Sequence, residues 1–295
     1  MQAQRAPLDR GRWHFQHGPI DLVIGAEGEA DAVAAAHEAA WQRFQAVLPE
    51  LVAELRCLRL PMRGPCALQG VIARRMWLAC RPYHSQFITP MAAVAGSVAQ
   101  ELVVSYARAG ITRAWVNNGG DIALHLAPGA AVKVGLFADL ARFDPLQAGL
   151  PIDGRFEVRA SMPVRGIATS GWRGRSFSLG IADSVTVLAR TAAMADAAAT
   201  VIANAVNVLD ARIERCPANQ LKDDSDLGDL EVTVGVSPLE ERQVLRALQA
   251  GERRARELQR EGLIHAAALV CQHRIARVGA LQLAPEKNEL ASAFA

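Results

Sequence analysis

The feature that most constrains the folding of this chain is a run of small residues, TAAMADAAATVIANAV, at positions 191–206. It predicts a buried helix over residues 191–209 that is almost entirely apolar. Asp196, Thr200 and Asn204 are spaced four apart, so they share one face of that helix. Carboxylate and hydroxyl oxygens suit Mg²⁺, and the polar stripe therefore predicts a metal or ligand site. In the alternative interpretation, Thr200 hydrogen-bonds to its own helix and Asn204 caps a loop.

Two other clusters combine glycines with small polar residues between strand-like segments. Their glycines allow positive φ and expose backbone N–H groups to a ligand, although such sequences also form ordinary hairpin turns. We expect both clusters to share one cleft with Asp196 and Thr200, because each is polar among apolar neighbours. The clusters consist of Asn118, Gly119, Gly120 and Asp121, and of Thr169, Ser170, Gly171, Ser176 and Ser178.

A balanced charge favours small-molecule chemistry over binding to nucleic acid. The 295 residues include 32 Lys and Arg against 30 Asp and Glu, which gives a formal net charge of only +2. The five cysteines form no C-x-x-C pair, and the start MQAQRAPLDRGRWHFQ lacks the apolar core of a signal peptide. The longest uncharged run, residues 82–100, is too polar to span a bilayer. We therefore expect a cytoplasmic protein that binds a small molecule or nucleotide and neither nucleic acid nor membrane; a homodimer is compatible with the sequence.

The order of the predicted elements indicates an α+β fold in which antiparallel sheets are backed by helices. Hairpins are expected over residues 12–24 and around the NNGG turn, and further strands over 132–137 and within 164–188. Helices are expected over 29–56, where Pro49 predicts a break, and over 71–79, 90–109 and 239–261. No internal repeat is visible in the residues.

The predicted organisation is two halves with a ligand cleft between them. Residues 1–215 are expected to form the core, residues 216–262 an inserted acidic excursion followed by a charged helix, and residues 263–295 closing strands with a frayed C-terminus.

Three segments, in a fixed order, resemble the ApbE-type flavin transferase superfamily: VNNGGDIA, GIATSG and SVTVLARTAAMADAAATVIAN. Three ordered motifs are far more specific than any one of them. The chain is similar in more detail to a short, uncharacterised ApbE-like branch, through PMAAVAGSVA, RSFSLGIADSVTV and the opening hairpin, up to about residue 207. The resemblance implies an ApbE-like, two-halved fold.

The resemblance also implies a Mg²⁺ site and an FAD site. Asp196 and Thr200 match the side-chain ligands of the metal, and a carbonyl ligand would come from about Val94, close to Gly96. In the flavin transferases the metal orients the FAD pyrophosphate while FMN passes to a Ser or Thr of an acceptor flavoprotein. The two glycine-containing clusters would then help to bind the cofactor.

Two departures from the flavin transferases bear on the chemistry. Ala95 replaces the Lys of their A-K-G segment, and their H-x-x-D-P segment with its catalytic His is missing between Gly171 and Ser184. The remaining candidates for catalytic roles are Asp183, Arg175, His84 and Asp121.

Three functional hypotheses follow from these residues. The first is a Mg²⁺-assisted enzyme acting on a nucleotide or phosphorylated ligand, most concretely by transferring FMN from FAD to a protein Ser or Thr. The second is a small-molecule hydrolase or lyase that uses the same scaffold without flavin transfer. The third is a non-catalytic ligand-binding or assembly protein.

Overall fold

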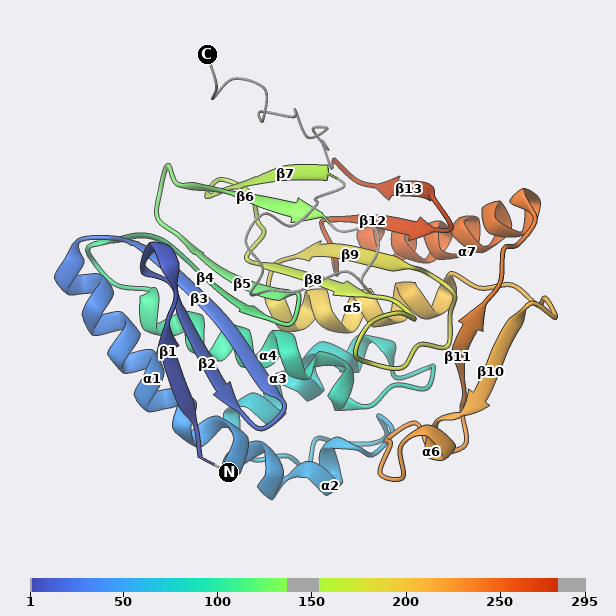
Figure 1. Ribbon diagram of the computed structural model, residues 1–295, viewed down its shortest axis with the longest axis horizontal. Coiled ribbons are helices and arrows are strands. Elements are labelled where there is room, and N and C mark those ends of the chain that lie inside the picture. The colour runs from blue at the N-terminus through green and yellow to red at the C-terminus, as the bar shows by residue number, and fades with distance from the viewer. Residues whose placement is uncertain (1, 137–153, 281–295) are drawn as a thin grey trace, which may run out of the picture.

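One antiparallel sheet of nine strands organises the protein (Figure 1). The computed structural model describes residues 2–136 and 154–280. Every neighbouring pair in the sheet is antiparallel, as the predicted α+β class requires. The strands, in spatial order, are β1 (Gln4–Pro7), β2 (Trp13–His17), β3 (Ile20–Gly28), β4 (Ile111–Asn118), β5 (Asp121–Leu126), β8 (Gly166–Ser170), β9 (Ser184–Ala189), β12 (Ala266–Cys271) and β13 (Arg274–Val278).

The sheet is built from two halves with the same topology. In each half, two strands are followed by helices and then by two more strands: β2 and β3 before β4 and β5, and β8 and β9 before β12 and β13. The halves meet where β5 pairs with β8 through only two residue pairs, Ile122 with Ile167 and Ala123 with Gly166. The strands β5 and β8 therefore form the boundary between the halves.

Helices cover one face of this sheet and enclose the main core. The helices α4 and α5 lie side by side near the middle of the molecule (Figure 1). Side chains alternate between the two faces along each strand, and Val116 and Val187 are among those that face the helices. The helices are α1 (Ala30–Ala53), α2 (Leu55–Leu58), α3 (Val71–Cys80), α4 (Val94–Val103), α5 (Ala192–Ala205), α6 (Ala218–Leu221) and α7 (Glu241–Arg260), with short 3₁₀ turns η1 (Asp9–Gly11), η2 (Arg81–Tyr83), η3 (Pro90–Ala93) and η4 (Val104–Tyr106).

A two-stranded ribbon, β6 (Ala131–Leu136) with β7 (Gly154–Arg159), covers part of the other face. A smaller apolar cluster fills the space between the ribbon and the sheet, with Phe156 and Val158 from the ribbon against Leu124, Ile167 and Leu188 from the sheet. The side chains of a strand point alternately to the two faces, and this second cluster uses the residues that the main core does not.

The last third of the chain adds a second ribbon and a long helix. The strands β10 (Ile213–Pro217) and β11 (Glu231–Val236) pair with each other, and α6 lies between them in the sequence. Helix α7 packs on α5, β12 and β13. The predicted closing strands, β12 and β13, complete the second half of the sheet, with β13 at its edge, whereas residues 281–295 lie outside the described residues.

Two expectations from the sequence require correction. Helix α1 runs through Pro49 without the predicted break, because Pro49 lies only one turn before the end of the helix and its side chain is exposed. The segment 216–230 is not a simple surface excursion, since it includes part of β10 and helix α6. Within residues 2–136 and 154–280, no helix combines the length and apolar character that crossing a membrane requires.

Candidate functional site

A cavity of about 380 Å³ lies at the boundary between the two halves of the sheet. Arg59 and six segments contribute to it: the segment 86–92, the start of α4, one face of α5, the start of β5, the segment 175–179 and the loop 222–227. Its polar lining consists of Arg59, Gln86, Thr89, Asp121, Arg175, Ser176, Asp196, Thr200, Asn204, Lys222, Asp224, Ser225 and Asp226.

Asp196 projects from α5 toward the first turn of α4. Its carboxylate accepts hydrogen bonds from the backbone N–H groups of Gly96, at 2.9 Å, and of Ala95. The residue before α4, Ala93, provides no side-chain cap, so Asp196 satisfies amides that the helix start leaves unpaired. This contact depends on Gly96, because a Cβ there would collide with the backbone carbonyl of Ala192.

Asp121 reaches the same cavity from the first position of β5. Its carboxylate accepts a hydrogen bond from the backbone N–H of Thr169, at 3.2 Å, across the boundary between the halves. Asn118 donates from its side-chain amide to the carbonyl of Ala95, at 3.2 Å, and so ties the turn to α4. At Gly119, which has a φ of 64°, a Cβ would collide with the guanidinium group of Arg175. The absence of a side chain at Gly119 thus lets this cation lie against the turn.

Burial raises the pKa of both carboxyl groups, and at Asp121 the charge of Asp196 adds to this effect. The pKa of Asp196 rises to about 7, mainly because burial disfavours the charged form, although the amides of Gly96 and Ala95 act in the opposite direction. The pKa of Asp121 also rises well above its ordinary value, through burial and the nearby charge of Asp196, against the stabilising effects of the Thr169 amide and Arg175. A positive charge in this cavity would stabilise both carboxylates.

The donor set of this cavity fits a hard divalent cation. Asp121 and Asp196 contribute carboxylate oxygens that repel each other, and Thr200 adds a hydroxyl one turn along α5. Val94 lines the cavity at the start of α4. Across the described ranges no three His, Cys, Asp or Glu side chains form a metal cluster, so a cation here would rely on mixed ligands and water, as Mg²⁺ usually does.

The loop 222–227 lines the cavity, which the sequence did not suggest. Thr89 donates a hydrogen bond from its hydroxyl to the carboxylate of Asp226, and Arg59 forms an ion pair with Asp224 at 2.7 Å. Lys222 contributes a further cation to the lining. The acidic composition of this stretch is typical of a solvated loop, so no signal in the sequence distinguishes it from one.

The ribbon β10–β11 makes hydrogen bonds to the segment 175–179 of the site. Arg215 donates to the carbonyl of Leu179 at 2.7 Å, and the backbone N–H of Thr233 donates to the carbonyl of Ser178 at 2.8 Å. These bonds fix the segment that carries Arg175 and Ser176.

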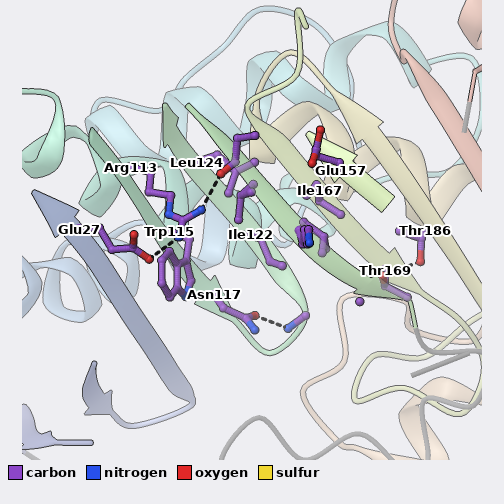
Figure 2. A pocket seen from close by; sticks show the side chains of 16 residues that line it. Glu27, Arg113, Trp115, Asn117, Ile122, Leu124, Glu157, Ile167, Thr169 and Thr186 are labelled. Atoms are coloured by element: carbon purple, nitrogen blue, oxygen red, sulfur yellow. Dashed lines mark hydrogen bonds and ion pairs between the residues drawn. The ribbon is translucent and has the colours of Figure 1, made fainter. Parts of the chain in front are cut away.

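Several predicted site residues lie elsewhere. Asp183 accepts a hydrogen bond from the backbone N–H of Gln272 at 2.5 Å, and the exposed His84 contacts the carbonyl of Arg81; neither lines the cavity. Ser178 is buried against Asn204, at 3.2 Å, and Ser170 and Gly171 do not line the cavity either. The residues Gly120 and Thr169 line a different cavity on the opposite face of the sheet (Figure 2).

Comparisons with known proteins agree with the resemblance in the motifs. A family model described as AbpE bacteria matches residues 3–283. The UPF0280 protein of Methanosarcina barkeri (strain Fusaro) is 34% identical over 201 residues, which cover 66% of this chain and 72% of that protein. The UPF0280 protein of Methanospirillum hungatei is 37% identical over 126 residues, or 42% of this chain and 47% of that protein.

Two solved structures are also similar to this chain. The ApbE protein from Thermotoga maritima has a TM-score of 0.45 and 12% identity, and the match covers 93% of this chain and 97% of that one. The flavinyl transferase ApbE of Pseudomonas stutzeri, in its apo form, has a TM-score of 0.45 and 11% identity, with 94% and 93% covered. From the family match over nearly the whole chain, this protein belongs to the family described as AbpE bacteria, an ApbE-like branch that has UPF0280 proteins among its relatives.

Proposed function

We propose that this protein is a Mg²⁺-assisted enzyme that acts on a nucleotide or phosphorylated ligand, most concretely by transferring FMN from FAD to a Ser or Thr of a flavoprotein. The observation that carries the proposal is that Asp121 and Asp196, more than 70 positions apart in the sequence, line one cavity with Thr200. Burial raises the pKa of both carboxyl groups, and the charge of Asp196 raises that of Asp121 further, so a divalent cation would stabilise the site.

Positive side chains at the same cavity support a phosphorylated ligand. Arg175 lies against the Gly119 turn and makes no ion pair or hydrogen bond with another residue that the structure describes. Lys222 lines the cavity from the loop, with its ammonium group 4.0 Å from Asp224. Guanidinium and ammonium groups bind phosphate oxygens, so an extended pyrophosphate could lie between these cations and a metal at Asp196.

The proposed transfer assigns separate tasks to the residues of the chain. The hydroxyl oxygen of the acceptor forms a bond to the FMN phosphorus, the pyrophosphate P–O bond breaks, and AMP leaves. Asp121 is the proposed acceptor of the hydroxyl proton, because its carboxylate lines the cavity, whereas Asp183 and His84 do not; Asp196 and Thr200 would hold the metal. Arg175 is proposed to stabilise the negative charge that develops on the phosphate, and a bound Mg²⁺ would supply further charge neutralisation.

Intact-mass measurement tests the proposal directly. The protein is incubated with FAD, Mg²⁺ and a candidate flavoprotein acceptor, and covalent FMN on the acceptor is expected. Asp196→Asn should abolish both the mass gain and any Mg²⁺-dependent thermal shift, whereas Asp31→Asn, on the exposed first turn of α1, should leave both unchanged. Equal thermal shifts in the two variants would reject the metal role of Asp196.

The second candidate function is a diverged activity or ligand binding without flavin transfer. It is favoured by the positions of Asp183 and His84, because neither replaces the missing catalytic His at the cavity. Tight FAD binding without transfer to any acceptor would support a carrier, and no FAD binding at all would support an enzyme for another small molecule.

A further inference from the structure

A second and larger cavity, of about 690 Å³, lies between the sheet and the ribbon β6–β7 (Figure 2). It lies on the face opposite to α4 and α5, because its lining residues in β4 and β5 alternate with those of the main core. Its volume is in the range of pockets that hold small ligands, roughly 300–1,000 Å³. The function proposed above makes no use of it.

One wall of this cavity is the sheet, where an aromatic side chain lies beside aliphatic ones, and the ribbon β6–β7 provides the facing wall. Trp115 lies against β3 at Gly25, where any Cβ would collide with the indole ring, so the ring is held in place by the missing side chain. Ile122, Leu124 and Ile167 provide the aliphatic surface, as Figure 2 shows. Val132 and Val134 line the cavity from the ribbon, so the fixed indole forms part of one side of a slot between two layers that favours a planar ring.

The polar end of the cavity offers an unused hydrogen-bond donor. The hydroxyl oxygens of Thr169 and Thr186 are 2.9 Å apart, and Thr186 is only 4% exposed. One hydroxyl donates to the other, so the second hydroxyl hydrogen has no acceptor among the described residues. A ligand with an acceptor atom at this end would satisfy it.

The rim of the cavity carries Lys133, whose cross-strand neighbour in the ribbon is Glu157. Arg113 is fully engaged, since it donates to Glu27 at 2.7 Å and to the carbonyl of Ala131 at 2.8 Å. Glu157 accepts from Arg159 at 2.5 Å. Lys133 lines the cavity and makes no ion pair with another residue in the described part of the chain. The rim therefore favours an anionic substituent.

We propose that this second cavity binds a planar aromatic molecule that carries one anionic group. The ring lies between Trp115 on the sheet and the valines of the ribbon, an acceptor atom meets the Thr169–Thr186 pair, and the anionic group meets Lys133. This site is separate from the carboxylate cavity, and its occupancy does not require flavin transfer.

Fluorescence titration of the full chain with 8-anilinonaphthalene-1-sulfonate, an aromatic anion with a planar naphthalene ring, tests the proposal. Saturable binding of one molecule per chain is expected. Lys133→Gln should weaken binding about two- to fivefold, the value of one exposed charge pair, while Lys133→Arg retains it. Thr169→Val should weaken binding about two- to tenfold, the value of one hydrogen bond, and unchanged circular dichroism confirms that each variant folds.

Two controls separate this cavity from the first one. Lys222→Gln, at the carboxylate cavity, should leave the affinity unchanged. N-phenyl-1-naphthylamine, which is neutral, should bind the parent and Lys133→Gln equally. The proposal is overturned if the probe does not bind, if every variant binds it equally, or if only Lys222→Gln weakens it.

Discussion

Asp196 has two structural roles that compete with each other. Its carboxylate completes the start of α4 through the amides of Ala95 and Gly96, and the same group faces a cavity that it shares with another carboxylate. The amides at the helix start stabilise the negative charge of Asp196, whereas burial opposes it. The net result is a carboxyl group that titrates near neutral pH.

This balance predicts how stability depends on pH. The pKa of Asp196 rises from 3.8 to about 7 on folding, so the protonated group stabilises the fold fully below pH 3.8 and this contribution is lost as the pH rises through 7. Without Mg²⁺, the Tm of the parent should fall between pH 5 and pH 8 relative to that of Asp196→Asn. Groups with lowered pKa values, such as Glu101 and Asp210, stay ionised throughout this window.

Thermal unfolding of both proteins at four pH values, with and without Mg²⁺, provides the measurement. Saturating Mg²⁺ should restore the Tm of the parent at pH 8 and leave that of Asp196→Asn unchanged. If the Tm of the parent and that of Asp196→Asn change in parallel with pH in the absence of Mg²⁺, the raised pKa of Asp196 is contradicted.

Thr89 donates a hydrogen bond to Asp226 and so holds the loop 222–227. We expect the loop to open more often when this hydrogen bond is weakened. Asp226→Asn removes the charge from the acceptor and should cost about 1–2 kcal/mol of local stability, since hydrogen bonds to charged groups are worth about 1.5–3 kcal/mol. Hydrogen exchange should accelerate in residues 222–227 and stay unchanged in α5. Asp223→Asn is the matched control, because Asp223 does not line the cavity; acceleration in both variants would reject a specific latch.

Single site residues can be predicted from the sequence where their spacing is regular within one element. Asp196 and Thr200 are separated by one helical turn, and Asp121 ends a recognisable turn, so all three could be predicted and all three line the cavity. Thr89 and Asp226 are 137 positions apart and join through tertiary packing alone, which no local pattern encodes.

Close packing between α4 and α5 determines where the site forms. The small residues of α5 are almost all buried, and Gly96 lets the backbone of α4 contact Ala192 directly. Thr191 begins α5 by accepting a hydrogen bond from the amide of Met194, at 3.3 Å. Both helices could be predicted from small-residue composition, whereas their contact depends on the strands that carry them.

Helix α1 provides a test of an element that the sequence predicts incorrectly. Pro49 removes one backbone hydrogen bond from the helix, and its side chain is exposed. Pro49→Ala should therefore raise the free energy of unfolding by about 1–2 kcal/mol, less than the ~3 kcal/mol helix penalty because the unfolded chain gains freedom. Urea denaturation measures the change. Pro238→Ala, outside any helix, should give no gain, and a destabilised Pro49→Ala would indicate that the ring has a packing role.

The two halves of the molecule share one apolar core. The β5–β8 pairing is narrow, but one apolar core includes residues of both halves and all the large helices. The antiparallel α+β class could be predicted from the order of hairpins and helices. The repeated topology could not, because the halves share their arrangement of strands and not their residues.

A core substitution in one half of the molecule should therefore destabilise both halves. Leu102 of α4 is fully buried, so Leu102→Ala should cost about 2–5 kcal/mol, while Leu209→Ala, at a position that is 97% exposed, should change stability by less than about 0.5 kcal/mol. Hydrogen exchange should report equal losses of protection in β4 and in β12. A loss confined to the first half would show that the halves unfold separately.

The two cavities share a wall that is one strand thick at Thr169. Its backbone amide donates to Asp121 in the first cavity, while its hydroxyl faces the second. Thermodynamic linkage is reciprocal, so a ligand that shifts this residue from one side changes the proton affinity of Asp121 by the same factor that protonation of Asp121 changes the affinity for the ligand. A titration of either cavity is therefore complete only when the occupancy of the other is held fixed.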